Sequence, residues 1–554
     1  MLPYISGNRS LRMPKEFRFN FLIFLSVFFL YIISFKLRGF IPYDETRYIS
    51  IAWEMWQGKN FLIPHINGNI YADKPPLLFW LINAGWYLTG VNDWWPRAIS
   101  FIFAFINIYL TRHIALQLWP EIKEFKKTIP IILISMPVWI YYSIPLMFDM
   151  LQVCLVLTAI SGLLQFHKNL FYGITLLGTA IGMSILLKGP VIFIYLLPLA
   201  VTLPLWNRIY PYSYGKLLLQ IVASLLLCSV IVFAWIIPVI HTLGLDPVGN
   251  IFWHQTTDRI MHATSHSNPF WWYLYFLPLL LFPWFYSSGF NPKTLVKIRQ
   301  ISPQIIFCLT WLLAPFILFS LIDAKQLHYL LPLVPALAIL IAYKLSQCEK
   351  TGVINFRLAG IIYISIGLLF LIYKLINVYL QNDFWISGIS SMWALIAVIG
   401  GMLLFFDYKT DNVHPALLPG ITSLVITFSL YICILLAPRP YTNLDKMGHI
   451  LAQFQKNNFP IANIGTHREQ FEFVGRLKRP LDKVNAVDIE QWAINHPEGY
   501  LVAKIRESDN PDTKLNIIYE QPYRFRHKLI LFNSKEILKN KINLNLISFY
   551  INHA

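Results

Sequence analysis

Charged residues are scarce in this sequence. Asp, Glu, Lys and Arg make up 13% of its 554 residues, whereas a soluble globular domain carries about 25%. Hydrophobic residues make up 56%, and long apolar stretches recur between Phe19 and Ala437. Each is close to the ~20 residues that an α-helix needs to cross a bilayer core. The composition excludes a soluble protein and predicts a polytopic membrane protein.

Cysteine and acidic residues are also few. The five cysteines contain no Cys-x-x-Cys pair and mostly lie in apolar stretches, so they predict no disulfide framework. Lys and Arg outnumber Asp and Glu by 45 to 28, which gives a net charge of +17. This excess is typical of positive-inside topology and would attract phosphate-bearing lipids. The basic residues are dispersed among loops, so we expect no nucleic-acid partner.

Hydropathy predicts about thirteen membrane-spanning helices. Their approximate limits are 19–38, 97–118, 129–146, 150–166, 170–187, 190–206, 217–240, 270–288, 303–322, 328–345, 357–378, 385–406 and 415–437. With the N-terminus in the cytoplasm, the cytoplasmic loops after the second, fourth, sixth, eighth and tenth spans are basic, as the positive-inside rule requires. The odd number of spans then places the C-terminus outside.

The chain divides into two predicted units. Residues 1–438 form the transmembrane unit, and residues 439–554 are polar and mixed in charge, which predicts a small α/β domain on the outer side. Within the outer loop 39–96, residues 45–57 are amphipathic, and residues 77–88 are apolar but too short to span. Both stretches are typical of helices that lie in the membrane interface.

Two polar motifs occupy this outer loop. The first is Asp44-Glu45-Thr46-Arg47-Tyr48, directly after the first span. Asp44 either caps the helix that follows or faces a cavity, and the two roles are compatible. The second is Tyr71-Ala72-Asp73-Lys74-Pro75-Pro76. Its Pro-Pro pair fixes the backbone beside Lys74, so that a phosphate-binding cation lies next to a carboxylate.

Further candidate residues lie in the other outer loops. Asp149 is a lone carboxylate in an apolar setting, which is a functional-site hypothesis unless it lies in a solvated turn. Lys188 would bind a lipid phosphate or extend from a helix end to the interface. A third loop carries His254 and Arg259, and residues 323–329 form a short polar connection. Cations for phosphate oxygens together with carboxylates for developing charge are typical of sugar-phosphate chemistry.

These motifs resemble the N-terminal signature of the ArnT/PMT-type glycosyltransferases of the GT-C class. The likeness is greatest to the 4-amino-4-deoxy-L-arabinose lipid A transferases and covers most of residues 40–340. The matching residues are Asp44-Glu45-x-Arg47-Tyr48, Pro64-x-x-Asn67-Gly68, Tyr71-x-Asp73-Lys74-Pro75-Pro76, Asp149, Lys188-Gly189-Pro190 and Tyr329-Leu330-Leu331-Pro332. One departure is Asp73, which stands where the family has Glu and reaches one methylene less.

The resemblance implies a function and a set of site residues. The protein would transfer aminoarabinose from undecaprenyl (polyprenyl) phosphate to lipid A on the periplasmic face of the bacterial inner membrane, a lipopolysaccharide modification linked to polymyxin resistance. Asp44 and Asp149 would be catalytic. The residues that would bind phosphate or line the cavity are Arg47, Tyr48, Tyr71, Lys74, Lys188, Arg259 and Tyr329. A divalent metal, with zinc as the candidate, would lie near Asp73 and His254, and no nucleotide cofactor is expected.

Three alternatives remain open from the sequence. A PMT-like enzyme would glycosylate protein or glycan hydroxyls, and Asp44 would then act as a base rather than as a positioning or charge-stabilising group. A lipid transporter or flippase would also need many spans and buried charges, but the sequence shows no inverted repeat. A non-catalytic scaffold would not need clustered carboxylates.

Overall fold

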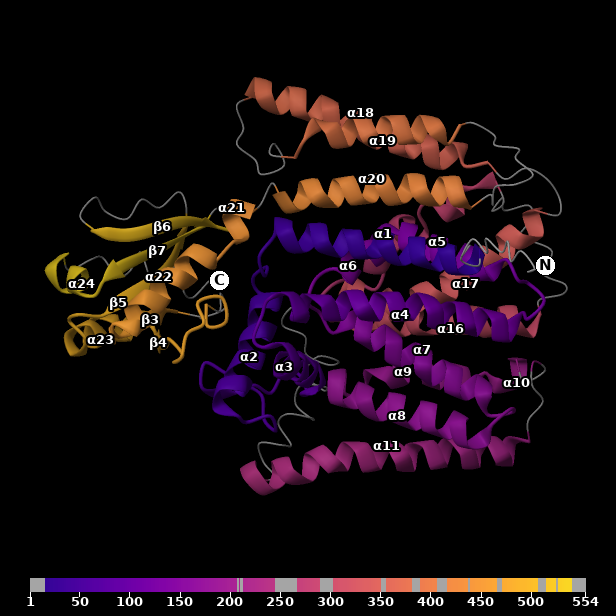
Figure 1. Cartoon of the computed structure of the whole chain (residues 1–554), viewed down its shortest axis with the longest axis horizontal. Coiled ribbons are helices and arrows are strands. Elements are labelled where there is room, and N and C mark those ends of the chain that lie inside the picture. The colour runs from indigo at the N-terminus through magenta and orange to yellow at the C-terminus, as the bar shows by residue number, and fades with distance from the viewer. Residues whose placement is uncertain are drawn as a thin grey trace, which may run out of the picture.

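A computed structural model shows a helical bundle with a separate α/β unit at one end (Figure 1). It describes residues 15–206, 209, 213–244, 267–288, 302–349, 355–380, 389–405, 416–436, 439–465, 471–506, 515–524 and 527–540. The long helices run side by side, and the short helices α2 (Asp44–Gly58) and α3 (Leu77–Thr89) lie at the end of the bundle nearest the α/β unit.

Eight helical segments within the described ranges are long and apolar enough to cross a membrane. They are Arg18–Leu37, Trp94–Leu118, Leu170–Val201, Gly215–Leu243, Pro303–Leu321, Leu327–Gln347, Arg357–Asn377 and Leu417–Ile434. The elements that form them are α1 (Lys15–Leu37), α4 (Trp94–Leu118), α8 (Leu170–Lys188), α9 (Ile192–Val201), α11 (Tyr214–Leu243), α16 (Pro303–Leu321), η7 (Leu327–Leu333), α17 (Val334–Glu349), α18 (Arg357–Leu380) and α20 (Leu417–Leu436). A polytopic membrane fold is thereby confirmed.

Several predicted spans correspond to shorter helices. These are α5 (Phe125–Ser135), α6 (Pro137–Ser143), α7 (Asp149–Gln165), α10 (Leu203–Trp206), α14 (Leu277–Leu281) and α19 (Ser391–Leu403). The predicted span 129–146 is divided between α5 and α6 because Pro137 follows an extended Met136 with ψ 122°, and a residue before proline is disfavoured in the helical region. Similarly, Gly189 (φ 70°) and Pro190 separate α8 from α9.

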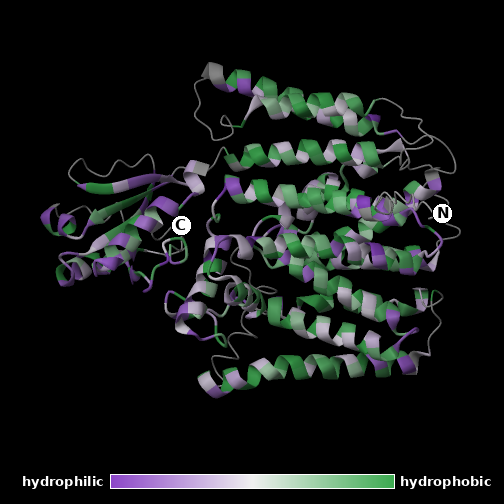
Figure 2. Cartoon of the chain, in the orientation of Figure 1, coloured by the Kyte–Doolittle hydropathy of each residue, from purple (hydrophilic) through white to green (hydrophobic). Residues whose placement is uncertain are grey.

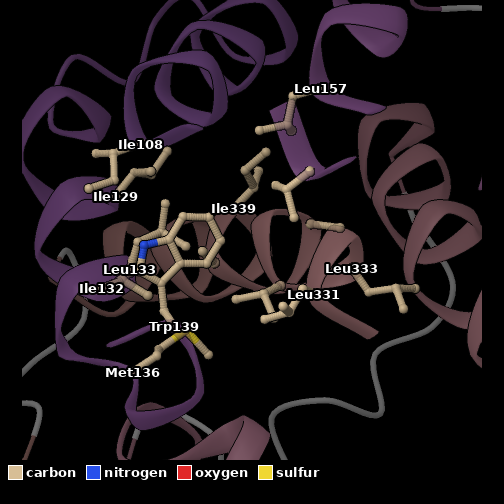
Figure 3. Packing of buried hydrophobic residues seen from close by; sticks show 14 of the residues in the cluster. Ile108, Ile129, Ile132, Leu133, Met136, Trp139, Leu157, Leu331, Leu333 and Ile339 are labelled. Carbon is tan, nitrogen blue, oxygen red and sulfur yellow. The ribbon is translucent and has the colours of Figure 1, made fainter. Parts of the chain in front are cut away.

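The bundle has a continuous apolar interior and an apolar outer surface. Figure 3 shows Trp139 of α6 packed among side chains of α4, α5 and α17, and this tryptophan is 2% exposed. By contrast, Phe29, Leu226 and Leu369 on α1, α11 and α18 are all at least 60% exposed. Figure 2 shows the same contrast between the apolar bundle and the more polar α/β unit. Exposed apolar side chains on outer helices are the expected contacts with lipid tails.

Helices α7 and α8 approach each other closely through glycine. A Cβ atom at Gly162 of α7 would lie 2.7 Å from the backbone nitrogen of Leu177 and 2.9 Å from the carbonyl oxygen of Gly173, both on α8. Small residues permit this backbone approach between membrane helices. The pairing matters because Asp149 begins α7 and Lys188 ends α8.

The α/β unit is built on a five-stranded sheet with strand order β4-β3-β5-β7-β6. Strand β3 (Ile461–Ile464) pairs in parallel with β4 (Asp482–Val484) and β5 (Tyr500–Arg506), whereas β7 (His527–Asn533) is antiparallel to β5 and β6 (Ile517–Tyr523). The accompanying helices are α21 (Arg439–Thr442), α22 (Asp445–Lys456), α23 (Ile489–Asn495) and α24 (Lys535–Asn540). This part of the chain thus contains both strands and helices.

We expect Gly162→Ala to destabilise the protein by about 1–3 kcal/mol, because the added methyl group overpacks the contact between α7 and α8. The thermal midpoint of the purified protein, followed by tryptophan fluorescence, measures the effect. Gly215→Ala in α11 is the matched control, since its Cβ would meet only one atom, at 4.0 Å. Equal midpoints for the two variants would contradict the assigned helix contact.

Candidate active site

The outer loop contains the two predicted interfacial helices and a β-hairpin between them. Strands β1 (His65–Ile66) and β2 (Asn69–Ile70) are joined by Asn67 (φ 53°) and Gly68 (φ 75°), a pair typical of two-residue hairpin turns. The Glu54 carboxylate of α2 accepts hydrogen bonds from both turn N–H groups, at 2.5 and 3.1 Å. The turn is thereby fixed to the helix that carries the first polar motif.

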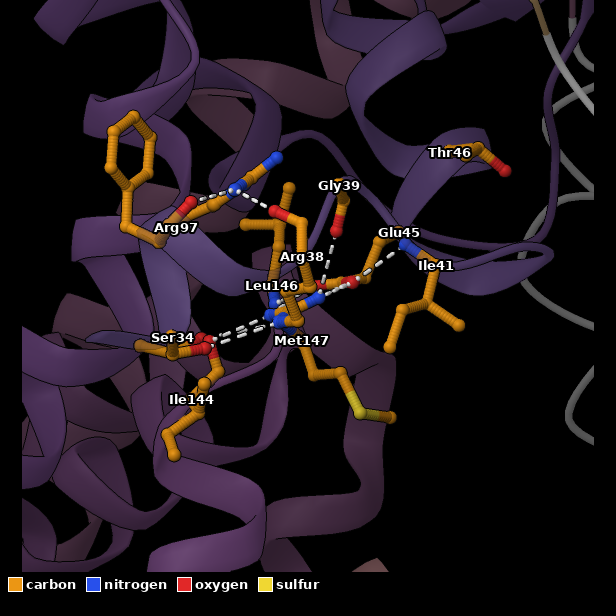
Figure 4. Close-up of polar contacts among 12 residues, drawn as sticks. Ser34, Arg38, Gly39, Ile41, Glu45, Thr46, Arg97, Ile144, Leu146 and Met147 are labelled. Atoms are coloured by element: carbon orange, nitrogen blue, oxygen red, sulfur yellow. Dashed lines mark hydrogen bonds and ion pairs between the residues drawn. The ribbon is translucent and has the colours of Figure 1, made fainter. Parts of the chain in front are cut away.

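Glu45 is the buried member of that motif. Its carboxylate, 3% exposed, forms an ion pair with Arg38 at the end of α1 (Figure 4). One oxygen also accepts a hydrogen bond from the Leu146 N–H at 2.6 Å, and the other accepts one from the Ile41 N–H at 2.9 Å. Burial acts to raise the pKa of Glu45, but Arg38 and these two N–H donors hold it below its ordinary value. A single carboxylate therefore joins α1, α2 and the loop that leads into α7.

Arg97 of α4 extends this buried network. Its guanidinium donates to the Arg38 carbonyl oxygen at 2.8 Å and lies 4.2 Å from the centre of the Phe40 ring. Arg38 in turn donates to the Ile144 carbonyl oxygen at 3.3 Å. Carbonyl oxygens of Gly39 and Ile144 accept further hydrogen bonds from Arg38, and those of Phe35 and Arg38 accept from Arg97, which partly compensates the burial of two guanidinium groups beside one carboxylate. The network fixes where the chain enters the outer loop.

Asp44, by contrast, faces outward. Its side chain is 54% exposed and accepts a hydrogen bond from Arg47 at 2.5 Å. The α2 helix begins at Asp44 itself, with Tyr43 at the cap position, so Asp44 does not cap it. Burial raises the pKa of Tyr48 above its ordinary value, the negative charges of Asp44 and Asp149 raise it further, and Arg47 opposes them. The charges of both predicted catalytic carboxylates, Asp44 and Asp149, thus raise the pKa of the same phenol, Tyr48.

Asp149 and Lys188 form a buried ion pair. The carboxylate is 3% exposed, and the distance from its Oδ1 to the Lys188 Nζ is 2.5 Å. His328 in η7 lies near the same oxygen, with its Nε2 3.9 Å away. The positive charge of Lys74 also acts on Asp149. The structure therefore brings together residues that are far apart in the sequence, as the topology predicted.

The predicted tyrosines border these charged groups. Tyr71 is buried and packs edge-to-face on Phe79 with 6.2 Å between ring centres. Tyr48 packs in the same way on Phe148, at 4.8 Å. The carbonyl oxygen of Tyr329 accepts a hydrogen bond from the hydroxyl of Tyr195 at 2.8 Å.

A metal site was predicted at Asp73 and His254. Among the residues that the structure describes, no three His, Cys, Asp or Glu side chains are close enough to hold a metal ion. His254 and Arg259 lie outside the described residues. The described residues do not fit a metal centre, so no step is assigned to a metal, and the predicted zinc site stays a prediction.

Three residues of this region, Glu45, Arg38 and His328, have no role assigned from the sequence. Glu45 was grouped with Asp44, yet it is a structural ion-pair partner, and Arg38 was placed at the end of a span. His328 was noted only as part of the polar connection 323–329, but it lies beside Asp149. The only sequence signal for a role of His328 is its position at the start of an apolar helix. Its proximity to Asp149 depends on the packing of η7 against α7.

Known proteins resemble this chain in sequence. The chain is 30% identical over 354 residues to an undecaprenyl phosphate-alpha-4-amino-4-deoxy-L-arabinose arabinosyl transferase of Pseudomonas aeruginosa, covering 61% of this chain and 62% of that protein. A transferase of the same type from Proteus mirabilis is 27% identical over 404 residues, 68% of this chain and 71% of the relative. The chain thus matches less than two thirds of the length of the first relative. No family model matches the chain.

A solved structure matches more of the chain. ArnT from Cupriavidus metallidurans bound to undecaprenyl phosphate gives a TM-score of 0.72 at 18% identity, over 92% of this chain and 97% of that one. Its apo structure gives 0.71. The chain has the fold of ArnT. The polytopic GT-C architecture and the resemblance to aminoarabinose transferases, both inferred from the motifs above, are confirmed.

We expect Glu45→Gln to destabilise the protein by about 3–5 kcal/mol, because it leaves the buried Arg38 guanidinium without its counter-ion. Glu16→Gln is the control, since Glu16 forms exposed ion pairs with Arg112 and Lys126 and exposed pairs contribute little. Thermal unfolding of the two variants in detergent would compare them. A wild-type midpoint for Glu45→Gln would show that the buried pair does not support this fold.

Proposed function

We propose that the protein transfers 4-amino-4-deoxy-L-arabinose from a polyprenyl phosphate to a phosphate of lipid A, on the outer face of the bacterial inner membrane. The buried Asp149–Lys188 pair, next to the loop that carries Asp44 and Arg47, is the observation that carries this proposal. The names of the relatives and the ArnT fold support the choice of sugar and lipid.

The cations have a common task in this reaction. Transfer breaks the bond between the anomeric carbon and the donor phosphate oxygen, and the departing polyprenyl phosphate keeps the electron pair. A charge-assisted hydrogen bond from Lys188 to that oxygen would stabilise the developing charge. Arg47, Lys74 and Arg259 would bind the remaining phosphate oxygens of donor or acceptor. Asp149 holds the Lys188 ammonium in place before the substrate binds.

Asp44 has a different role in this scheme. A lipid A phosphate is already an anion, so its attack on the anomeric carbon needs no general base. The exposed Asp44 carboxylate would stabilise positive charge on the sugar ring and orient Arg47, with which it pairs. Tyr48, Tyr71 and Tyr329 would shape the sugar cavity.

The proposed orientation in the membrane follows the predicted thirteen crossings. In Figure 1, the helices α2 and α3 and the α/β unit lie at one end of the bundle, and the start of α1 lies at the opposite end. With the N-terminus in the cytoplasm, Asp44 and residues 439–554 would face the periplasm. This arrangement places the site where both lipid substrates would meet it.

Expression of the protein in a bacterial strain that lacks its own aminoarabinose transferase but makes the lipid-linked sugar should add aminoarabinose to lipid A. Mass spectrometry of extracted lipid A measures this addition. Unmodified lipid A together with a newly glycosylated protein would favour the PMT-like alternative. Unmodified lipid A with faster movement of the lipid donor across the membrane would favour a flippase, and either result would refute the proposed transfer.

We expect Lys188→Ala to lower the turnover number about 10²–10³-fold, the usual effect of removing one hydrogen-bond donor to a developing negative charge. Transfer from a purified lipid-linked sugar to lipid A would be measured with protein in detergent. Lys168→Ala is the control, because Lys168 is an exposed lysine in the loop between α7 and α8. Asp44→Asn should also slow transfer. Normal turnover by Lys188→Ala or Asp44→Asn would remove the affected residue from the proposed site.

A further inference from the structure

The α/β unit inserts one aromatic side chain into the outer loop. Phe473 lies between β3 and β4 and is completely buried, yet it packs in the cluster formed by α2, α3 and the start of α7 rather than in the core of its own unit. Its ring stacks on Trp86 of α3 with 5.1 Å between ring centres and an angle of 9° between the planes. It also packs edge-to-face on Trp53 of α2, at 6.0 Å. Phe473 therefore lies between the two interfacial helices.

Polar contacts hold the same turn in place. The carbonyl oxygen of Leu477 accepts hydrogen bonds from the side chains of Trp53 and Gln57, each at 2.9 Å. Arg476 forms an ion pair with Asp93 at 2.6 Å, at the start of α4. The Arg476 guanidinium also lies 3.7 Å from the centre of the Phe473 ring. These hydrogen bonds and the ion pair have a defined geometry. Together with the ring contacts of Phe473, they join the α/β unit to α2, α3 and α4.

The contacts of Phe473 continue to both candidate catalytic carboxylates. Tyr48 and Phe148, which pack on each other, belong to the same buried cluster, and Phe148 directly precedes Asp149. Phe473 also packs on Phe40, at 5.6 Å, beside the Arg38–Glu45 network. A second contact from the α/β unit, Arg524 over the ring of Tyr43 at 4.1 Å, lies directly before Asp44.

We propose that the turn from Phe473 to Leu477 is a positioning element for sugar transfer. It holds α2 and α3 at a fixed separation, so that Asp44 and Arg47 keep their place relative to Asp149 and Lys188. The inference rests on the proposed transferase function and gives the α/β unit a role in turnover. A misplacement of about 1 Å at a reacting group costs about 10²-fold in rate.

The test uses the full-length protein and compares Phe473→Ala with Phe454→Ala. Phe454 is the matched control, because it stacks on Tyr500 within the α/β unit, with 3.9 Å between ring centres. For Phe473→Ala we expect the turnover number of the folded protein to fall at least ~10-fold, with the KM for the lipid-linked donor changed less than the turnover number. For Phe454→Ala we expect a lower thermal midpoint and an unchanged turnover number.

A second measurement stays informative if Phe473→Ala folds poorly. Asp93→Ala, Arg476→Ala and the double variant should reduce the turnover number non-additively, so that the double variant is no slower than the slower single variant. Three results would overturn the inference: a wild-type turnover number for Phe473→Ala, an equal loss of turnover in Phe454→Ala, or additive losses of turnover for Asp93→Ala and Arg476→Ala. If the wild-type protein still transfers the sugar, these results leave the proposed function standing. A wild-type protein without transferase activity would overturn both.

Discussion

The arrangement of the candidate site depends on one buried ion pair, between Arg38 and Glu45. Its carboxylate is bonded at both oxygens, and its partners belong to the end of α1, the turn after it and the loop before α7. An unpaired charge in this environment would cost several kcal/mol, so the pairing with Arg38 and the two N–H donors stabilise the buried Glu45 carboxylate together. Asp44, the neighbour of Glu45, and Asp149, three residues after Leu146, are therefore held in a fixed relation.

Much of this site could be predicted from the sequence. Asp149 and Lys188 were expected on the same membrane face, because one helical hairpin connects them and its loop is short. The interfacial helices were predicted from an amphipathic pattern in residues 45–57 and from an apolar stretch too short to span in residues 77–88, and they appear as α2 and α3. In each case the signal was local: a hydropathy period, a stretch length or a charge in an apolar setting.

The remainder could not be predicted, because it depends on contacts between distant segments. Nothing in the sequence near Arg38 indicates that its side chain pairs with Glu45 and does not face solvent. Likewise, Phe473 has the surroundings of an ordinary core residue of an α/β domain, and only the structure shows that its ring packs on Trp86. Hydropathy alone also could not locate the helix ends within the predicted crossings. Residues such as Pro137 and Gly189 interrupt apolar stretches that hydropathy treats as uniform.

The salt link between Asp149 and Lys188 has a consequence for product release. A pocket with a permanently free ammonium would retain the spent lipid phosphate as tightly as it binds the donor. Here Asp149 already pairs with the same cation, at 2.5 Å, and in the proposed reaction it would regain this partner when the lipid phosphate leaves. The carboxylate would thereby weaken product inhibition.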